Sequence, residues 1–173
     1  KGDKIMHFTY CCHCGTKTIL KEIGDEGEIP YCPCCEVPLW DMFATSIICA
    51  VVNECGEIAL LHQDYVSKTH YVCVAGVMKL GESAEETAKR EVKEELGLDV
   101  SELEFIQTYP YIKKEMLMLG FKAVVKKADF VLSQEVDKAE WVNLGQALDK
   151  LREGSIAWQL VNEVIKSEHL DLK

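Results

Sequence analysis

Residues 76–98 constrain this chain most, because a strong helix signal there coincides with carboxylates in an unfavourable place. Ser83 is followed three residues later by Glu86, which is the spacing of a capping box, and Gly97 is a typical residue just beyond a helix end. These signals predict a helix over residues 83–96. Small and aliphatic residues recur within it every four positions and predict a face that packs on a core: Ala84, Ala88, Val92 and Leu96.

Three glutamates lie on or beside this apolar face. Glu91 and Glu95 are four residues apart and Glu94 follows Glu91 by three, so the three side chains gather near the buried side of the helix. Mutual repulsion and loss of hydration both oppose such a group unless a divalent cation binds it. Oxygen ligands alone favour a hard ion, so we expect Mg²⁺ or Mn²⁺. The alternative is a solvated charged face, which does not explain acids placed beside Ala88 and Val92.

The same stretch resembles the signature of the Nudix hydrolase superfamily. That signature is a glycine, five residues, a glutamate, seven residues, Arg-Glu, an aliphatic residue, any residue, Glu-Glu, any residue, a glycine and an aliphatic residue. Residues 76–98 fill every fixed position. The resemblance implies an α/β fold, the Nudix α/β/α sandwich with a mixed sheet. It also implies metal-dependent attack of water on a diphosphate linkage, a chemistry that bound divalent cations promote.

The resemblance implies a catalytic role for each charged residue of the motif. Glu91 and Glu95 are its principal ligands for Mg²⁺ or Mn²⁺, and Glu94 is a third carboxylate of the same cluster. Arg90 orients the glutamates through a salt bridge. Glu82 supports the loop that precedes the helix.

Further metal ligands are implied outside the helix. They are the backbone carbonyl of Ala75 and the side chain of Glu135. The general base stays open between Glu94 and Glu135, and a metal-bound hydroxide needs little help from a base.

A second motif precedes this stretch. Cys11 with Cys14, and Cys32 with Cys35, form two Cys-x2-Cys pairs. Four thiolates complete a tetrahedral structural zinc site and leave no position for water, so we expect Zn²⁺ to fold this part of the chain rather than to catalyse. Three neighbouring residues are competing zinc ligands: Cys12, His13 and Cys34. Disulfides or buried thiols that bind no metal are the alternative. The odd total of 9 cysteines and the absence of a secretory signal favour a metal site in the reducing cytoplasm.

The distribution of these motifs predicts two domains, a zinc ribbon at residues 1–41 and a Nudix hydrolase domain at residues 42–173. Apolar runs bounded by turn residues predict strands at 46–52, 57–61, 71–75, 103–108, 116–125 and 140–143, and helices at 145–152 and 155–167. Strands and helices mixed in this order predict a sheet covered by helices.

A zinc ribbon directly before a Nudix domain resembles the NADH pyrophosphatase branch of the superfamily. That resemblance implies hydrolysis of NADH or NAD⁺ to AMP and the nicotinamide mononucleotide, by a homodimer. It implies substrate contacts at six positions: Gly76, Val77, Gln107, Tyr109, Tyr111 and Ala157. Val77 departs from the branch, which has an aromatic residue there, and the two tyrosines also fit ordinary aromatic residues of a strand.

Other functions are compatible with the sequence. The substrate is alternatively ADP-ribose, a nucleotide sugar, a dinucleoside polyphosphate or an NAD-capped RNA end. A non-catalytic binding module is an alternative of another class, but the intact glutamates count against it. With 29 acidic and 19 basic residues, the net charge of −10 disfavours extended contact with nucleic acid. We expect a small nucleotide as the ligand and no membrane contact, because no apolar run is long enough to cross a bilayer.

Overall fold

The computed structural model describes residues 8–171 and divides the chain into two compact units, Lys1–Phe43 and Ala44–Lys173. Residues 1–7 of the expected ribbon lie outside the described residues. No helix of the described chain combines the length and the apolar character that crossing a membrane would require.

The N-terminal unit is a small antiparallel sheet. Its three strands, in the order β1-β2-β3, are β1 (Ile19–Glu22), β2 (Glu28–Cys32) and β3 (Val37–Pro38), and the short 3-10 helix η1 (Gly24–Glu26) joins the first two. The buried apolar residues of this unit are few: Cys11, Cys32 and Leu39. So small a core needs a crosslink or a metal ion for stability.

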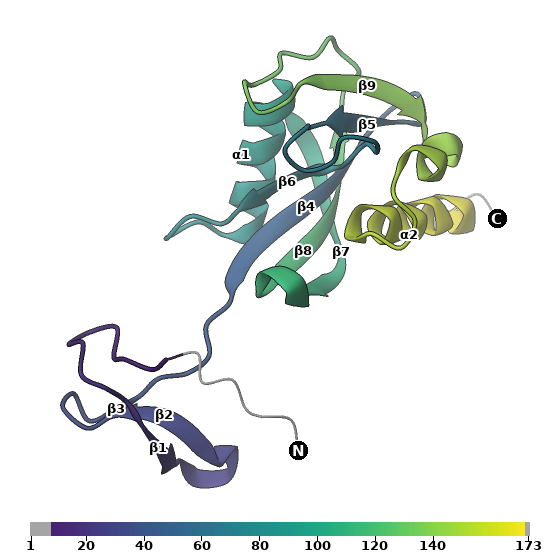
Figure 1. Cartoon of the computed structure of the whole chain (residues 1–173). Helices are drawn as coiled ribbons and strands as arrows, with labels where there is room; N and C mark the ends of the chain where they lie inside the picture. Colours follow the sequence, from purple (N-terminus) through teal and green to yellow (C-terminus); the bar gives the residue numbers. More distant parts are fainter. Residues whose placement is uncertain (1–7, 172–173) are drawn as a thin grey trace. The chain divides into compact units, whose positions relative to one another are not determined.

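The second unit is built on a mixed six-stranded sheet (Figure 1). Its strands are β4 (Ala44–Asn53), β5 (Glu57–His62), β6 (Val74–Val77), β7 (Val100–Tyr111), β8 (Met116–Val125) and β9 (Lys138–Asn143). The order is β7-β8-β4-β5-β9, and β6 pairs with β4. Strands β4 and β8 are parallel, whereas the other pairs are antiparallel. The helices are α1 (Ala84–Leu96), α2 (Ile156–Asp171) and the 3-10 helices η2 (Ile112–Lys114) and η3 (Leu144–Lys150).

Helices cover both faces of this sheet because successive side chains of a strand point to opposite sides. In β4, the odd-numbered residues from Ile47 to Val51 pack in the cluster with α1, and the even-numbered residues from Ile48 to Val52 pack in the cluster with α2. The predicted apolar stripe of α1 supplies three buried side chains to its cluster: Ala88, Val92 and Leu96. The expected α/β sandwich with a mixed sheet is therefore confirmed.

Helix α1 begins and ends where the sequence predicts. The hydroxyl of Ser83 accepts a hydrogen bond from the backbone N–H of Glu86 (3.1 Å), and the backbone N–H of Ser83 donates to the Glu86 carboxylate (2.8 Å). Gly97 ends the helix in the left-handed conformation with φ 74°. A capping box and a left-handed glycine fix the register of the helix, so the spacing of its glutamates can be read directly from the sequence.

Two predicted elements are wrong in detail. The expected helix at 145–152 is the 3-10 helix η3. Its apolar residues pack on the cluster beneath α2, but a segment of 7 residues is too short to gain much from the cooperative extension of an α-helix. The expected strand at 71–75 is regular only over Val74–Val77, while Tyr71 and Val72 make isolated bridges. Gly76 does not end this strand. It pairs with Ile47 in the sheet, and the absence of a Cβ lets the side chain of Glu91 approach it closely.

Candidate active site

The most buried carboxylate of the second unit is Glu95 on α1. Its side chain is 3% exposed; Oε1 accepts a hydrogen bond from Gln63 Nε2 (3.2 Å), and Oε2 has no hydrogen-bond partner within residues 8–171. Burial raises the pKa of Glu95 to about 7 against the opposing effect of Gln63, and the charges of Glu91, Glu135 and Glu94 add to the increase. A buried oxygen without a donor is costly. A divalent cation would remove both the unpaired oxygen and the repulsion, so the residues present fit a metal ion.

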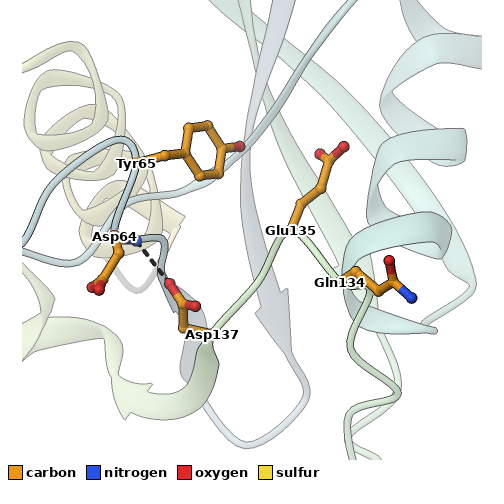
Figure 2. Close-up of a pocket in the computed structure, with 5 residues that line it drawn as sticks. All are labelled: Asp64, Tyr65, Gln134, Glu135 and Asp137. Atoms are coloured by element: carbon orange, nitrogen blue, oxygen red, sulfur yellow. Dashed lines mark hydrogen bonds between the residues drawn. The ribbon is translucent and has the colours of Figure 1, made fainter.

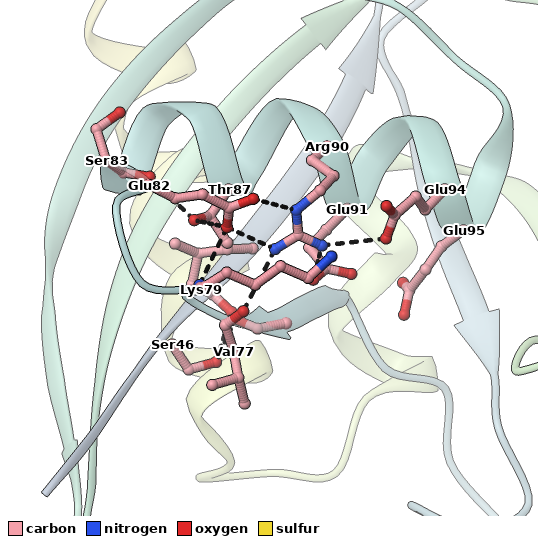
Figure 3. Close-up of polar contacts among 12 residues, drawn as sticks. Ser46, Val77, Lys79, Glu82, Ser83, Thr87, Arg90, Glu91, Glu94 and Glu95 are labelled. Carbon is pink, nitrogen blue, oxygen red and sulfur yellow. Dashed lines mark hydrogen bonds and ion pairs between the residues drawn. The ribbon is translucent and has the colours of Figure 1, made fainter.

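Arg90 connects the carboxylates of this region (Figure 3). Its Nε donates to Glu82 Oε1 (2.7 Å), and its Nη1 donates to Glu91 Oε1 (2.6 Å) and Glu94 Oε2 (3.0 Å). A guanidinium can hold several carboxylates at fixed angles because its five N–H groups lie in one plane. Hydrogen bonds from Arg90 lower the pKa of Glu82 to about 2, so Glu82 is ionised at neutral pH. Arg90 thus occupies the orienting position that the motif predicts.

Glu82 ties the loop before α1 to the helix. Its Oε2 accepts hydrogen bonds from the backbone N–H of Lys79 (3.1 Å) and from the hydroxyl of Thr87 (3.0 Å). Arg90 Nη2 also reaches the carbonyl of Val77 (3.3 Å). The end of β6, the loop and the helix are therefore joined through one carboxylate and one guanidinium.

Gly76 lies directly against Glu91. A Cβ at position 76 would lie 2.0 Å from both Cδ and Oε1 of Glu91, which is far inside van der Waals contact. The glycine is needed here for close approach rather than for a turn. Ala75 and Val77 flank it in β6, so the predicted residues of this strand lie beside the carboxylates of α1.

We expect Gly76→Ala to reduce activity strongly while leaving the protein folded. The added methyl group must push aside the end of the Glu91 side chain and disturb its ion pair with Arg90, which costs some stability but leaves the core on each face of the sheet intact. Misplacement of a reacting or ligating group by about 1 Å can cost on the order of 100-fold in rate. Steady-state kinetics and thermal unfolding measure the two effects. Gly145→Ala is the matched control, because its Cβ meets only Asn143 Oδ1 at 3.3 Å. Wild-type kinetics in Gly76→Ala would refute this role of Gly76.

A cavity of about 560 Å³ lies between the segment after β5 and the segment before β9 (Figure 2). Three of its five lining residues are acidic, and the others are a tyrosine and a glutamine: Asp64, Tyr65, Gln134, Glu135 and Asp137. The two segments are joined where the backbone N–H of Asp64 donates to Asp137 Oδ2 (2.7 Å). The backbone N–H of Ser133 donates to the carbonyl of Glu95 (3.4 Å), which attaches the segment carrying Glu135 to α1. The charge of Glu135 also contributes to the raised pKa of Glu95, so this predicted ligand lies within electrostatic range of the helix carboxylates.

Sequence reasoning missed the residues that follow β5. Gln63 contacts Glu95, and Asp64 and Tyr65 line the cavity. The available signal was a run of polar and aromatic residues at the end of a buried strand, a common place for functional residues. That signal does not say which helix the run contacts.

Not all of the predicted substrate residues lie near these carboxylates. Tyr109 is 3% exposed and packs with Ala157 in the cluster on the α2 face of the sheet, and Tyr111 packs against the same cluster. The alternation of side chains along β7 directs both tyrosines to this side, away from α1. Gln107 is exposed on the same strand. The structure thus brings together Gly76, Val77 and the glutamates but not these positions, whose contact with substrate stays a prediction.

The four paired cysteines of the N-terminal unit form one cluster. The Sγ atoms of Cys11, Cys14, Cys32 and Cys35 all lie within 4.8 Å of one another. Backbone N–H groups donate to two of the sulfurs, from His13 to Cys11 (3.4 Å) and from Cys35 to Cys32 (3.3 Å). Hydrogen bonding with Thr16 lowers the pKa of the Cys14 thiol to about 6, which favours the thiolate form that binds zinc.

The competing zinc ligands do not join this cluster. Cys12 and Cys34 are exposed, neither belongs to the group, and His13 contributes only its backbone N–H. All nine cysteines are free thiols. The cluster fits a tetrahedral zinc ion, for which four sulfurs at about 2.3 Å from the metal are typical.

Comparison with known proteins decides the family. The sequence-family model of the NUDIX domain matches residues 42–162, which is more than half of the chain. The chain belongs to the NUDIX family. The match includes α1 with all of its glutamates.

Relatives and solved structures are consistent with this assignment. The chain is 29% identical over 162 residues to the NAD-capped RNA hydrolase NudC of Pseudomonas aeruginosa, covering 93% of this chain and 57% of that protein. It is also 29% identical over 180 residues to NudC of Haemophilus influenzae, covering 98% of this chain and 67% of that protein. A NUDIX hydrolase from Nitrosomonas europaea shares the fold, with a TM-score of 0.71, 18% identity and coverage of 94% and 93%. The chain thus spans little more than half the length of the Pseudomonas relative.

Proposed function

We propose that this NUDIX domain uses Mg²⁺ or Mn²⁺ to hydrolyse the diphosphate linkage of NADH or NAD⁺, releasing AMP and the nicotinamide mononucleotide. The observation that carries the hydrolytic part is the buried Glu95, whose Oε2 has no hydrogen-bond partner within residues 8–171 and whose pKa is raised in part by the charges of Glu91, Glu135 and Glu94. The NAD part rests on the relatives that are NAD-capped RNA hydrolases, at 29% identity.

Each residue of the motif has a role in this proposal. Glu91 and Glu95, with Glu94, Glu135 and the carbonyl of Ala75, would hold the cation. When bound, Mg²⁺ neutralises the charge of the diphosphate and lowers the pKa of the attacking water.

The surrounding residues act on these carboxylates. Arg90 keeps Glu91 and Glu94 in fixed orientations, and Glu82 holds the loop against α1. Glu94 and Glu135 are the candidate general bases, since both are exposed to solvent.

We also assign the N-terminal part of the chain, residues 1–41, as a ribbon whose four clustered cysteines bind a structural Zn²⁺, and residues 42–173 as the hydrolase domain. A homodimer in the cytoplasm is the assembly expected from the resemblance to the NADH pyrophosphatase branch. Light scattering of the purified chain measures that assembly.

A second candidate substrate is an RNA that carries NAD at its 5′ end. The names of both relatives favour it. The net charge of −10 opposes it, because a long RNA would meet repulsion outside the metal site. A short capped end is compatible with this charge if the remaining nucleotides make few contacts.

The test is a product analysis with Mg²⁺ or Mn²⁺ present. NADH, NAD⁺, ADP-ribose, a nucleotide sugar, a dinucleoside polyphosphate and an NAD-capped oligonucleotide are incubated separately with the protein, and the products are separated by chromatography. We expect AMP and the nicotinamide mononucleotide from NADH or NAD⁺, and none from the Glu95→Gln variant. Faster cleavage of another compound would keep the hydrolytic proposal and replace the substrate. Turnover of none of them would favour a non-catalytic binding module.

A further inference from the structure

Gln63 is a buried amide whose side chain reaches the carboxylate of Glu95. It follows β5 immediately and is 5% exposed, in a position where an unpaired amide would be costly. Its Nε2 donates to Glu95 Oε1 at 3.2 Å. The two residues are far apart in the sequence, and neither the helix signal nor the NUDIX motif includes Gln63.

This hydrogen bond makes the two oxygens of Glu95 different. Oε1 has a donor, whereas Oε2 has no partner within residues 8–171. The last side-chain torsion of a glutamate has a broad energy profile, so a free carboxylate would sample many orientations. With Oε1 held by Gln63, the carboxylate keeps one orientation and Oε2 stays available to a cation.

The chemistry of the amide suits this role. A lysine or arginine in its place would neutralise Glu95 and compete with a cation for the same oxygens. An amide donates a hydrogen bond without adding charge, so the negative charge shared by Glu95 and Glu91 is retained for the metal. Metal ligands are commonly held by such neighbouring donors, and their loss typically weakens metal binding by about 10- to 100-fold.

The same residue also shapes the wall of the cavity. The carbonyl of Gln63 accepts hydrogen bonds from the backbone N–H groups of Val66 and Ser67, both at 2.9 Å. These bonds close the turn that carries Asp64 and Tyr65, two residues of the cavity lining. Gln63 therefore fixes a carboxylate through its side chain and the adjacent cavity wall through its backbone.

We propose that Gln63 is a positioning residue of the active site, which holds Glu95 in the orientation that binds the catalytic cation. This inference rests on the proposed function, because it takes Glu95 to be a metal ligand. It predicts that loss of the amide weakens binding of the metal more than it slows the reaction once the metal is bound.

The experiment measures Mn²⁺ binding directly. Free Mn²⁺ is followed by electron paramagnetic resonance as it is added to the full, zinc-loaded chain. For Gln63→Met, which has a similar size and no donor, we expect a dissociation constant about tenfold higher than in the wild type. Gln63→Asn, whose amide ends one methylene short of Glu95, should show the same direction. The Mn²⁺ concentration for half-maximal activity should rise in parallel, with a smaller change in kcat at saturating metal.

Asn53→Ala is the matched control. Asn53 is also a buried amide, 6% exposed, but its Oδ1 accepts hydrogen bonds from Cys55 and Glu57 in the turn between β4 and β5. This variant should unfold at a lower temperature and bind Mn²⁺ like the wild type. Unchanged Mn²⁺ binding in both Gln63 variants would overturn the inference, as would equal weakening in Asn53→Ala. Unchanged binding in Glu95→Gln would instead refute the proposed metal site itself.

Discussion

Glu95→Gln is expected to abolish metal-dependent hydrolysis and, at the same time, to stabilise the metal-free protein at pH 8. The side chain is 3% exposed, and burial is the main cause that raises its pKa from 4.5 to about 7. Loss of activity follows because a neutral amide oxygen is a weaker ligand for Mg²⁺ than a carboxylate and does not balance its charge. The gain in stability follows because the variant no longer buries a charge.

The pH dependence of this gain has a definite sign. Below pH 4.5 the carboxyl is protonated in both the folded and the unfolded protein, so the charge has no cost. As the pH rises from 4.5 to 7, the unfolded chain releases the proton first, and the folded state loses stability relative to it. A pKa increase of this size corresponds to a cost on the order of 3 kcal/mol, which is fully present above pH 7.

Thermal unfolding without added Mg²⁺ or Mn²⁺, at pH 4.5 and at pH 8, measures this effect. At pH 8 the variant should unfold several degrees higher than the wild type, since about 1 kcal/mol corresponds to a few degrees for a domain of this size. At pH 4.5 the difference should be small. Glu94→Gln is the control, because its side chain is 51% exposed and pairs with Arg90, so its removal relieves no buried charge. A Glu95→Gln variant that is no more stable than the wild type at pH 8 would contradict the buried charge, and one that still hydrolyses substrate would contradict the metal site.

The parts of the fold that the sequence predicts well carry strong local signals. The bounds of α1 follow from the capping box at Ser83 and the glycine at position 97, and the strand predicted at 116–125 matches β8. Elements with weak local signals were predicted less well. The strand expected at 71–75 stops before Gly76, whereas Gly76 lies inside β6, where the absence of a Cβ lets Glu91 approach the strand closely. The reason for that glycine is a tertiary contact, which a single sequence does not display.

The same distinction applies to the candidate site. The gathering of Glu91, Glu94 and Glu95 follows from helical spacing, so it could be predicted from the sequence alone. The contact between Gln63 and Glu95 depends on how β5 packs beside α1, and no pattern in the sequence predicts it. Tyr109 shows the reverse case. Its place in the sequence predicts a substrate contact. In the structure, the alternation of side chains along β7 directs Tyr109 into the core beneath α2.

The other large effect is expected for the N-terminal unit, where Cys32→Ser should release zinc and unfold the ribbon. Cys32 is fully buried, and its Sγ lies 3.5 Å from that of Cys14 in the cluster. Few apolar side chains are buried in residues 8–43, so we expect the strands of this unit to depend on a bound metal ion for stability. Binding of a structural zinc ion is worth about 10–16 kcal/mol at pH 7 in zinc-finger peptides, more than this core can replace.

Zinc content and two-dimensional amide NMR spectra measure the outcome. We expect about one zinc ion per chain in the wild type. In Cys32→Ser we expect almost no zinc, together with collapse of the dispersed signals from residues 8–43. Signals from residues 44–171 should persist, because that unit has its own core on both faces of its sheet. Cys12→Ser is the matched control, since Cys12 is exposed, adjacent to Cys11 and outside the cluster, and it should keep both zinc and fold. Retention of zinc by Cys32→Ser, or its loss from Cys12→Ser, would show that a different set of ligands binds the metal.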